Sequence, residues 1–344
     1  MKEIVVNASK QYSVTIGSGV LSQVVKITAA VTNARRICIV SDSNVWPIYG
    51  NAVKTGLASA GYSVCYYVFS AGENSKNSTT YLDLLSFLSE NELTRADCIV
   101  ALGGGVVGDL AGFAAATYLR GIPYIQVPTT LLAMVDSSVG GKTAINLPVG
   151  KNLCGAFYQP SAVLCDTNTL STLPKEVFRD GCAEVIKYAV LFDPELFALL
   201  EKDGLAFDRE SVITRCVQHK RDVVAQDEFD RGRRMLLNLG HTIGHAIETY
   251  SNFAVSHGCA VAIGMAVTAR AVKCTDCQRM VALIKQFGFP TTTDIPSDAL
   301  YCAMLADKKR SSSSINLIIP KAIGHCTIMP TPVDELKTFI EEGM

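Results

Sequence analysis

The sequence has no apolar stretch long enough to cross a membrane and almost no net charge. A membrane-spanning helix needs about 18 apolar residues in a row, and the longest candidate, Gly103 to Leu119, contains Asp109 and is rich in glycine. The formal net charge is -1, so charge favours neither nucleic acid nor an anionic membrane as partner. Met1 to Asn7 have the pattern of a strand rather than a signal peptide. We therefore expect a cytoplasmic protein.

Two familiar catalytic motifs are incomplete. A zinc-protease motif would need Glu directly after His241, and Thr242 occupies that position. Gly140 to Thr143 have the sequence of the end of a P-loop, but Asp136 stands where the first glycine should be. Peptide hydrolysis by the zinc-protease route and nucleoside triphosphate hydrolysis are therefore not expected.

The composition is that of a globular protein with room for two domains. Of the 344 residues, 49% are hydrophobic and 18% are charged. The twelve cysteines are scattered, mostly in apolar runs, where cysteine behaves as a small hydrophobe. Cys274 and Cys277 form one Cys-x-x-Cys without the second pair of a zinc knuckle. A redox or metal role for this pair is only a minor alternative.

Strand and helix patterns alternate in the first half of the chain. Short apolar runs bounded by polar residues are typical of buried parallel strands, and they predict an α/β domain. The predicted elements are a hairpin at 4–6 and 12–16, strands at 36–40, 63–69, 98–102, 124–127 and 163–166, and helices ending near 61, at 78–90 and at 110–118.

From about residue 174 the pattern becomes mainly helical, so we place a domain boundary there, with domains at 1–173 and 174–344. Helices are predicted at 175–191, 194–203, 209–226, 231–251, 257–274, 279–287 and 297–306, followed by a small hairpin at 315–319 and 326–329.

A glycine-rich segment, Gly103 to Asp109, joins the strand at 98–102 to the next helix. This layout is typical of a phosphate cradle, because glycines allow close approach and the helix N-terminus offers free N–H groups. A tight structural turn is the alternative. The acidic residue usually found about 20 positions later is missing. We therefore expect a variant dinucleotide site in which Asp42, after an earlier strand, holds the ribose.

Two of the five histidines, His241 and His245, stand four residues apart, which on a helix puts them on one face. Such a pair can bind a divalent metal; packing in a core is the alternative. Glu184 lies in a predicted buried helix one turn before Lys187, where an exposed ion pair is the alternative. Glu184, His241 and His257 together would form a catalytic zinc site with an open position.

Several basic residues are candidates for binding substrate anions. Each alone is typical of a solvated surface charge, and sequence spacing does not show whether they lie together. They are Lys142, Lys151, Lys187, Lys220, Arg234 and the cluster Asp307-Lys308-Lys309.

Taken together and in order, these motifs resemble the 3-dehydroquinate synthase family over nearly the whole chain. The resemblance implies a Rossmann-like N-terminal domain with a parallel sheet that binds NAD. It also implies a mainly α-helical C-terminal domain for metal and substrate, an active site in the cleft between the domains, and a homodimer. The matching motifs are Gly103 to Leu110, Pro128 to Leu132, Asp136 to Thr143, Gly150 to Asn152, Ala183 to Tyr188, Asn238 to Glu248, His257-Gly258, Gly264-Met265 and Asp307 to Lys309.

The implied reaction converts a sugar phosphate, 3-deoxy-D-arabino-heptulosonate 7-phosphate, into 3-dehydroquinate and phosphate in the shikimate pathway. NAD and a Zn2+ or Co2+ ion are the implied cofactors. The order is oxidation of the C5 hydroxyl, elimination of phosphate, reduction, ring opening and aldol closure. This order is chemically reasonable, because a temporary ketone acidifies the neighbouring C–H and lets phosphate leave.

The resemblance also implies residue roles. Glu184, His241 and His257 are implied metal ligands, and His245 would handle a proton near the leaving phosphate. The implied phosphate ligands are Lys142, Asn152, Lys187 and Arg120, the last from the partner subunit; the carboxylate, ring oxygens and hydroxyls would be bound by Lys220, Arg234, Lys308 or Lys309, Asn238 and Asp136. The implied NAD-binding residues are Asp42, Asn44, Glu73, Lys76, Gly104, Gly105, Val106, Val107, Gly108, Asp109, Thr129, Thr130, Lys142, Lys151, Thr169, Leu170, Ser171 and Thr172.

One position departs from the family pattern. Cys259 follows His257-Gly258 where the family usually has Glu. The change removes a residue that would support the metal ligands in the family, but it does not affect any of the three ligands.

Three alternatives remain open. A related cyclase that makes an inosose or a valiolone shares the metal and NAD motifs, although Lys220 and Arg234 favour an acid substrate. A metal-dependent polyol dehydrogenase shares the two-domain plan. A non-catalytic binding protein would be expected to have lost the ligands or the glycine turn, and both are present.

Overall fold

The computed structural model describes residues 1–307 and 313–344, and it divides into two compact units. The first unit comprises Met1–Pro174 and Arg209–Phe229, and the second comprises Lys175–Asp208 and Asp230–Met344. In the described ranges, no helix is both long and apolar enough to cross a membrane. Lys308 and Lys309 lie outside the described residues.

The elements follow the predicted alternation and then the predicted helical run. The strands are β1 (Lys2–Val6), β2 (Tyr12–Gly17), β3 (Arg36–Asp42), β4 (Ser63–Phe69), β5 (Cys98–Gly103), β6 (Tyr124–Pro128), β7 (Lys142–Leu147), β8 (Gly150–Phe157), β9 (Ala162–Asp166), β10 (Ser314–Ala322) and β11 (His325–Pro332). The helices are α1 (Val24–Val31), α2 (Asn51–Ser59), α3 (Ser78–Glu90), α4 (Gly105–Thr117), α5 (Lys175–Phe192), α6 (Pro194–Asp203), α7 (Arg209–Gln226), α8 (His241–Tyr250), α9 (His257–Ala271), α10 (Cys277–Gln286), α11 (Ser297–Asp307) and α12 (Leu336–Gly343).

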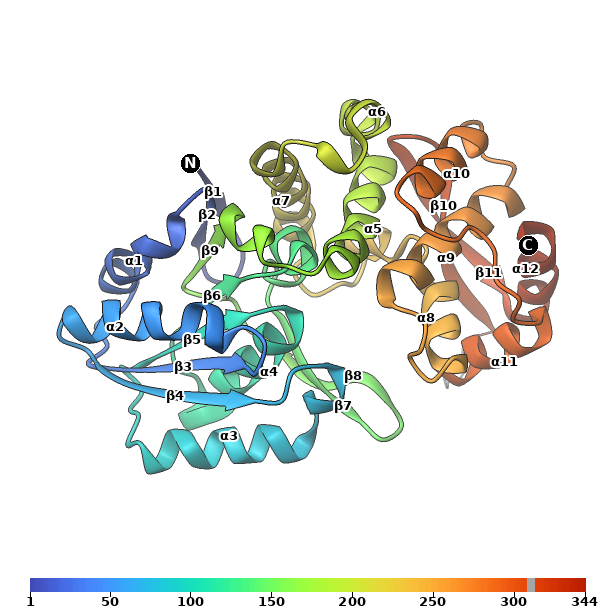
Figure 1. Cartoon of the computed structure of the whole chain (residues 1–344). Coiled ribbons are helices and arrows are strands. Elements are labelled where there is room, and N and C mark those ends of the chain that lie inside the picture. The colour runs from blue at the N-terminus through green and yellow to red at the C-terminus, as the bar shows by residue number, and fades with distance from the viewer. Residues whose placement is uncertain (308–312) are drawn as a thin grey trace. The chain divides into compact units, whose positions relative to one another are not determined.

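A seven-stranded sheet forms the centre of the first unit (Figure 1), in the order β1-β2-β9-β6-β5-β3-β4. All neighbouring pairs are parallel except the β1–β2 hairpin. The chain adds β4 on one side of β3 and β5 on the other, which creates a topological switch point between β3 and β5. In open α/β sheets, ligands bind at the carboxyl ends of strands beside such a point.

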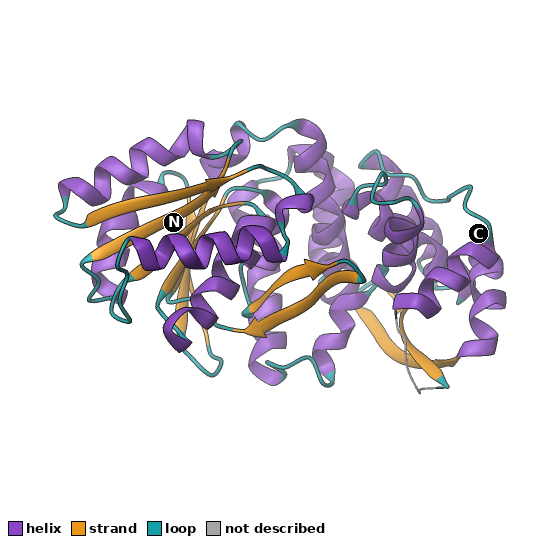
Figure 2. Cartoon of the chain, turned by 90° about the horizontal axis from the view of Figure 1, so that it is seen from below, coloured by secondary structure: helices purple, strands orange, loops and turns teal. Residues whose placement is uncertain are grey.

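Both faces of this sheet are covered, as its apolar strands require. On β3, Ile37 and Ile39 pack with α1 and α2 on one face, whereas Cys38 and Val40 pack with α3 and α4 on the other. Figure 2 shows helices on both sides of the large sheet, and the hairpin β7–β8 forms a separate two-stranded sheet. The predicted α/β class of the N-terminal part and the helical class of the C-terminal part are confirmed.

Helix α7 groups with the first unit, although the boundary drawn from the sequence assigns it to the second domain. It packs against β1 and β2. The amino group of Met1 lies 2.9 Å from Glu210 Oε1. In the loop after α7, the carboxylate of Glu228 accepts a hydrogen bond from the amide of Ser9 at 2.7 Å. An amphipathic pattern predicts that a helix buries one face, but it does not identify the surface that receives it.

Two predicted helices have different boundaries in the structure. Helix α4 starts at Gly105 rather than at 110, so most of the glycine-rich segment forms its first turns. The helix predicted at 231–251 is interrupted: a 3-10 segment, Arg233–Asn238, precedes Gly240, and α8 begins at His241. Gly240 has φ +78°, and a Cβ there would lie 2.6 Å from the carbonyl oxygen of Val261 on α9. The chain therefore turns at Gly240 because α9 leaves no room for a side chain.

The β7–β8 hairpin was not predicted. Lys142, which follows the P-loop-like glycines, begins strand β7 rather than a helix. The absence of a helix there agrees with the exclusion of a P-loop, because a P-loop ends at a helix N-terminus.

In the second unit, helices α8, α9, α11 and α12 and strand β10 share one core. Helix α5 is buried continuously from Gly181 to Leu191, so it is the interior helix of this unit. The polar side chains inside that stretch must have partners in order to be tolerated.

Candidate metal centre and nucleotide-binding edge

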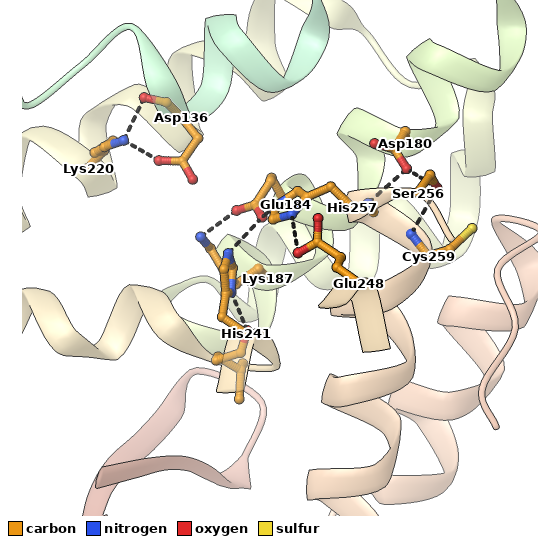
Figure 3. A network of polar contacts seen from close by, with 12 residues as sticks. Asp136, Asp180, Glu184, Lys187, Lys220, His241, Glu248, Ser256, His257 and Cys259 are labelled. Atoms are coloured by element: carbon orange, nitrogen blue, oxygen red, sulfur yellow. Dashed lines mark hydrogen bonds and ion pairs between the residues drawn. The ribbon is translucent and has the colours of Figure 1, made fainter. Parts of the chain in front are cut away.

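Glu184, His241 and His257 come together from three helices of the second unit. Glu184 lies in the middle of α5, while His241 and His257 are the first residues of α8 and α9. The Glu184 oxygen Oε1 lies 3.3 Å from Nε2 of His241 and 3.2 Å from Nε2 of His257. One ligand atom from each residue lies within 4.8 Å of the others, and this is the one such group in the described ranges. Figure 3 shows the three side chains converging.

The second nitrogen of each imidazole ring faces an acceptor. His241 Nδ1 lies 3.0 Å from the carbonyl oxygen of Leu239, and His257 Nδ1 lies 3.5 Å from Oε2 of Glu248. Because a carbonyl oxygen only accepts hydrogen bonds, Nδ1 of His241 must carry the proton. The other ring nitrogen, Nε2, faces Glu184, and this is the nitrogen that is left to bind a metal.

The electrostatics of the cluster keep the carboxyl group of Glu184 ionised. Glu184 and Lys187 are each 1% exposed and form an ion pair one helical turn apart. Burial alone would raise the pKa of Glu184, but the Lys187 ammonium group and His241 hold it well below its usual range. Burial lowers the pKa of His257, but hydrogen bonds to Glu184 and Glu248 outweigh this effect and raise it to about 10.

The donor set fits a zinc or cobalt ion. A carboxylate and two neutral imidazoles are typical of catalytic zinc sites, which keep a further position open for water or substrate. Glu184 supplies the carboxylate, and the Nε2 atoms of both histidines lie beside it. The Nε2 proton of His257, whose pKa is about 10, would be released when a metal binds.

Asp180 holds the N-terminus of α9 against α5. Its Oδ1 accepts the amide of Gly258 at 2.8 Å and the hydroxyl of Ser256 at 2.5 Å. Ser256 in turn caps α9 by accepting the amide of Cys259. Since Asp180 and Glu184 are one turn apart on α5, this clamp sets the position of His257 relative to Glu184 (Figure 3).

His245 lies outside the three-residue group. Its ring centroid is 5.5 Å from that of His241, with the rings nearly perpendicular. The structure thus gives the two histidines different surroundings although their spacing puts them on one helix face. Cys274 and Cys277 are both free thiols, and neither belongs to the metal-ligand group.

Many of the residues expected to bind NAD follow the carboxyl ends of neighbouring strands of the large sheet. Asp42 ends β3, Gly104 follows β5, and the N-terminus of α4 begins at Gly105. Thr129 and Thr130 follow β6, and the segment Thr167–Ser171 follows β9. These strands are adjacent in the parallel part of the sheet, so the segments meet at one edge beside the switch point.

Some side chains at this edge form hydrogen bonds or packing contacts within the turns that follow the strands. Asp42 Oδ1 accepts the amides of Asn44 and Val45 at 2.9 Å, which forms the turn after β3. A Cβ on Gly104 would come within 3.0 Å of Thr130 Cγ2. The turn after β5 therefore has little space for a side chain, as in backbone cradles that approach phosphates.

Lys76 links the glycine-rich helix to the β7–β8 hairpin. Its Nζ lies 2.5 Å from Oδ2 of Asp109 and 2.5 Å from Oδ1 of Asn152. Glu73 accepts the side-chain amide of Asn146 at 2.7 Å. Asn146 in turn accepts the main-chain amide of Asn152 at 2.9 Å, so Glu73, Lys76, Asp109 and Asn152 belong to one polar network.

Lys220 of α7 pairs with Asp136, and both lie in the first unit. Lys220 is 5% exposed, and its Nζ also donates to the main-chain oxygen of Asp136 at 2.5 Å. Arg120 is exposed in a 3-10 turn with φ +66°. Lys142 is exposed and Lys151 half-buried on the β7–β8 hairpin, while Arg234 and Asn238 lie in the 3-10 segment before Gly240, where Arg234 is 1% exposed.

Sequence reasoning assigned no role to Asp180, Ser256 or Glu248. Glu248 was detectable in principle, because it stands seven residues after His241 and therefore falls on the same face of a helix. Asp180 and Ser256 carry no such signal, since their contacts join different helices.

Comparisons with known proteins agree with this geometry. Residues 66–180 match a family described as "3-dehydroquinate synthase N-terminal", and residues 181–310 match "3-dehydroquinate synthase C-terminal". The 3-dehydroquinate synthase of Enterococcus faecalis is 42% identical over 352 residues, which cover 99% of this chain and 98% of that protein.

Two solved structures share the fold at 26% sequence identity and a TM-score of 0.88. One is 2-deoxy-scyllo-inosose synthase complexed with carbaglucose-6-phosphate, NAD+ and Co2+, and the match covers 100% of both chains. The other is 2-epi-5-epi-valiolone synthase from Streptomyces hygroscopicus subsp. jinggangensis 5008 with NAD+ and Zn2+ bound, and it covers 99% of this chain and 98% of that one.

Proposed function

The chain belongs to the 3-dehydroquinate synthase family, and we propose how its own residues perform the reaction of that family. The reaction converts 3-deoxy-D-arabino-heptulosonate 7-phosphate into 3-dehydroquinate and phosphate, a step of the shikimate pathway towards chorismate and the aromatic amino acids. The observation that carries this function is the Glu184–His241–His257 cluster in a chain whose two halves both match the family.

Glu184, His241 and His257 would hold a Zn2+ or Co2+ ion. The short distances from Glu184 Oε1 to both Nε2 atoms support this role. Such an ion, when bound, lowers the pKa of a substrate hydroxyl and polarises a developing carbonyl. Lys187 supports the cluster by keeping Glu184 ionised.

NAD would bind along the carboxyl edge of the first unit and would supply a reversible hydride acceptor. The N–H groups at the start of α4, beyond Gly104 and Gly105, would bind its pyrophosphate. Asp42 would bind a ribose, and the turn after β9 would line the site. The remaining residues proposed for this site are Asn44, Glu73, Lys76, Val106, Val107, Gly108, Asp109, Thr129, Thr130, Lys142, Lys151, Thr169, Leu170, Ser171 and Thr172.

Lys142, Asn152 and Lys187 would bind the leaving phosphate, with Arg120 contributed by a second subunit. Positive groups fixed around a leaving phosphate stabilise its growing charge. His245 would hold or move the proton that accompanies this departure. It lies one turn from His241, close to the metal ligands but outside their group.

Lys220, Arg234 and Lys308 would bind the carboxylate and ring oxygens, and Asn238 and Asp136 the hydroxyls. This assignment draws on residues of both proposed domains, the N-terminal domain at 1–173 and the C-terminal domain at 174–344. The burial of Lys220 and Arg234 supports a role beyond surface charge, because buried cations are usually paired or bind anions.

We also propose a cytoplasmic homodimer whose small-molecule partner is the sugar phosphate, without nucleic acid or membrane partners. The twelve cysteines are all free, which suits a reducing compartment. The net charge of -1 provides no general attraction for polyanions.

The test is phosphate release from 3-deoxy-D-arabino-heptulosonate 7-phosphate, with glucose 6-phosphate as the comparison substrate. We expect release from the first substrate, abolition by EDTA, and recovery on addition of Zn2+ or Co2+. Release from glucose 6-phosphate alone would favour an inosose-forming cyclase, the alternative that the 26% identical solved structure suggests. Net NADH formation with a polyol would instead indicate a dehydrogenase.

A further inference from the structure

One face of α8 carries three functional groups in sequence. His241, His245 and Glu248 stand at positions i, i+4 and i+7, which align along one side of a helix. His241 belongs to the metal-ligand group, but Glu248 is directed at a different ligand. Its Oε2 lies 3.5 Å from Nδ1 of His257, the first residue of α9 (Figure 3).

Glu248 is 3% exposed, so its carboxyl group is removed from water. A carboxylate in such a place is costly unless it accepts hydrogen bonds or faces a positive group. Because an ionised carboxylate can only accept hydrogen bonds, the contact with Glu248 requires a proton on Nδ1 of His257. The other ring nitrogen, Nε2, lies 3.2 Å from Glu184 Oε1, and it is the nitrogen that would bind a metal once it has given up its own proton.

The two histidine ligands are oriented by different means. His241 is oriented by a main-chain carbonyl, that of Leu239, which no substitution removes. His257 depends on a side chain from another helix. Cys259, two residues further along α9, carries no carboxylate to do this, and Asp180 is already engaged by the amide of Gly258 and the hydroxyl of Ser256.

We propose that Glu248 is the positioning residue of His257 and thereby sets the affinity of the metal centre. This inference rests on the proposed function of Glu184, His241 and His257 as metal ligands. It makes α8 responsible for two of the three ligands: it supplies His241 directly and orients His257 through Glu248. Carboxylates hydrogen-bonded to a ligating imidazole raise its basicity, and their loss typically costs about 10–100-fold in metal affinity.

The test is Co2+ binding to metal-free protein, followed by visible absorption and by competition with a chelator. Glu248→Gln keeps the size of the side chain and removes its charge. We expect about 10–100-fold weaker Co2+ binding and an altered Co2+ spectrum. Glu342→Gln, the same change at an exposed position of α12, is the matched control and should bind as the wild type does.

Thermal melting separates positioning from simple stabilisation. A positioning role predicts a smaller rise in melting temperature on adding Co2+ to Glu248→Gln than to the wild type. A lower melting temperature of the metal-free variant, with an unchanged Co2+ affinity and an unchanged rise, would overturn the inference. If the wild type itself binds no Co2+ or Zn2+, the proposed metal centre fails, and that result is distinct from equal binding by both proteins.

A second measurement needs no variant. In zinc-loaded wild type with 15N-labelled histidine, NMR should show a slowly exchanging proton on Nδ1 of His257 and none on Nε2. A rapidly exchanging Nδ1 proton, or a proton on Nε2, would contradict the role of Glu248 even if the Gln variant does not fold.

Discussion

His241 and His245 show how strongly the role of a residue depends on what reaches it from other elements. Both lie on one face of α8, and both are partly exposed. His241 lies beside the buried carboxylate of Glu184, at 3.3 Å, and belongs to the metal-ligand group, whereas His245 does not belong to it. We therefore expect experiments to show that His241 is a metal ligand and that His245 acts on the substrate.

Replacing His241 with Ala should lower the metal content after dialysis, because one of three ligands is lost. Replacing His245 with Ala should leave metal bound and slow phosphate release by about 10²–10⁴-fold, the usual contribution of proton transfer. Metal content by elemental analysis and phosphate release by a coupled assay measure the two effects. Equal loss of metal in both variants would contradict this division.

Asp97 is a buried carboxylate whose task is structural. Its Oδ1 accepts the amides of Arg35 and Arg36 at 3.1 and 2.8 Å, and its Oδ2 accepts the amide and hydroxyl of Thr94 at 2.7 and 2.8 Å. Burial acts to raise the pKa of Asp97, but these hydrogen bonds hold it below its usual range.

Asp97→Asn should lower the free energy of unfolding by about 1–3 kcal/mol near neutral pH, because buried donors lose their acceptor. A depressed pKa stabilises the fold above the unfolded-state pKa of about 3.9, and this contribution is lost as the pH falls through the folded-state value. Denaturant unfolding should show that the free energies of unfolding of wild type and variant differ by a constant amount from pH 7 downwards. This difference should become smaller only below about pH 4. If the difference in free energy of unfolding does not change with pH, the ionised carboxylate of Asp97 is not its cause.

At the scale of elements, the contact between α8 and α9 determines the metal centre. Gly240 and Gly264 meet where the two helices approach, and a Cβ on Gly264 would lie 2.0 Å from the carbonyl oxygen of Gly240. Real Cβ atoms do not come so close, so the helices pack through backbone. Because His241 directly follows Gly240, a shift at this contact displaces a ligand.

Gly264→Ala should separate α8 from α9, lower the free energy of unfolding by about 1–3 kcal/mol or more, and reduce metal content as well. Gly56→Ala in α2 is the control, because a Cβ there meets nothing closer than 3.7 Å; it should be neutral or stabilising by up to about 1 kcal/mol. Thermal melting and elemental analysis measure both effects. A Gly264→Ala protein that keeps wild-type stability and metal content would refute the close contact.

At the scale of the whole molecule, the proposed homodimer can be tested through Arg120. Sedimentation should give a mass of twice the 36.9 kDa of one chain. Arg120 is exposed on its own subunit, as a residue that reaches into a neighbouring site must be before assembly.

Mixing inactive Arg120→Ala and His245→Ala proteins, followed by unfolding and reassembly, should restore phosphate release. In a mixed dimer, one site then combines an intact His245 with an intact Arg120 from the partner, so about a quarter of all sites should be active after random assembly. If Arg120 served its own subunit, every site would lack one of the two groups. The mixture would then stay inactive.

Local pattern is enough to predict much of this protein. Apolar runs such as 36–40 and 98–102 have to be buried on both faces, so a parallel sheet follows from the sequence. The predicted hairpin at 4–6 and 12–16 and the helical second half are present in the structure. The resemblance of ordered motifs supplied the family, because many short matches along one chain are far more specific than any one of them.

Other features depended on tertiary structure, because they join residues that are distant in sequence. The helix breaks at Gly240 because α9 packs closely there. Helix α7 belongs to the first unit because it packs against β1 and β2. The sequence supplied Glu184, His241 and His257 as candidate ligands. Only the folded chain brings their donor atoms within 4.8 Å and directs Glu248 at His257, since helix periodicity orders side chains along one helix but cannot say which helix lies opposite.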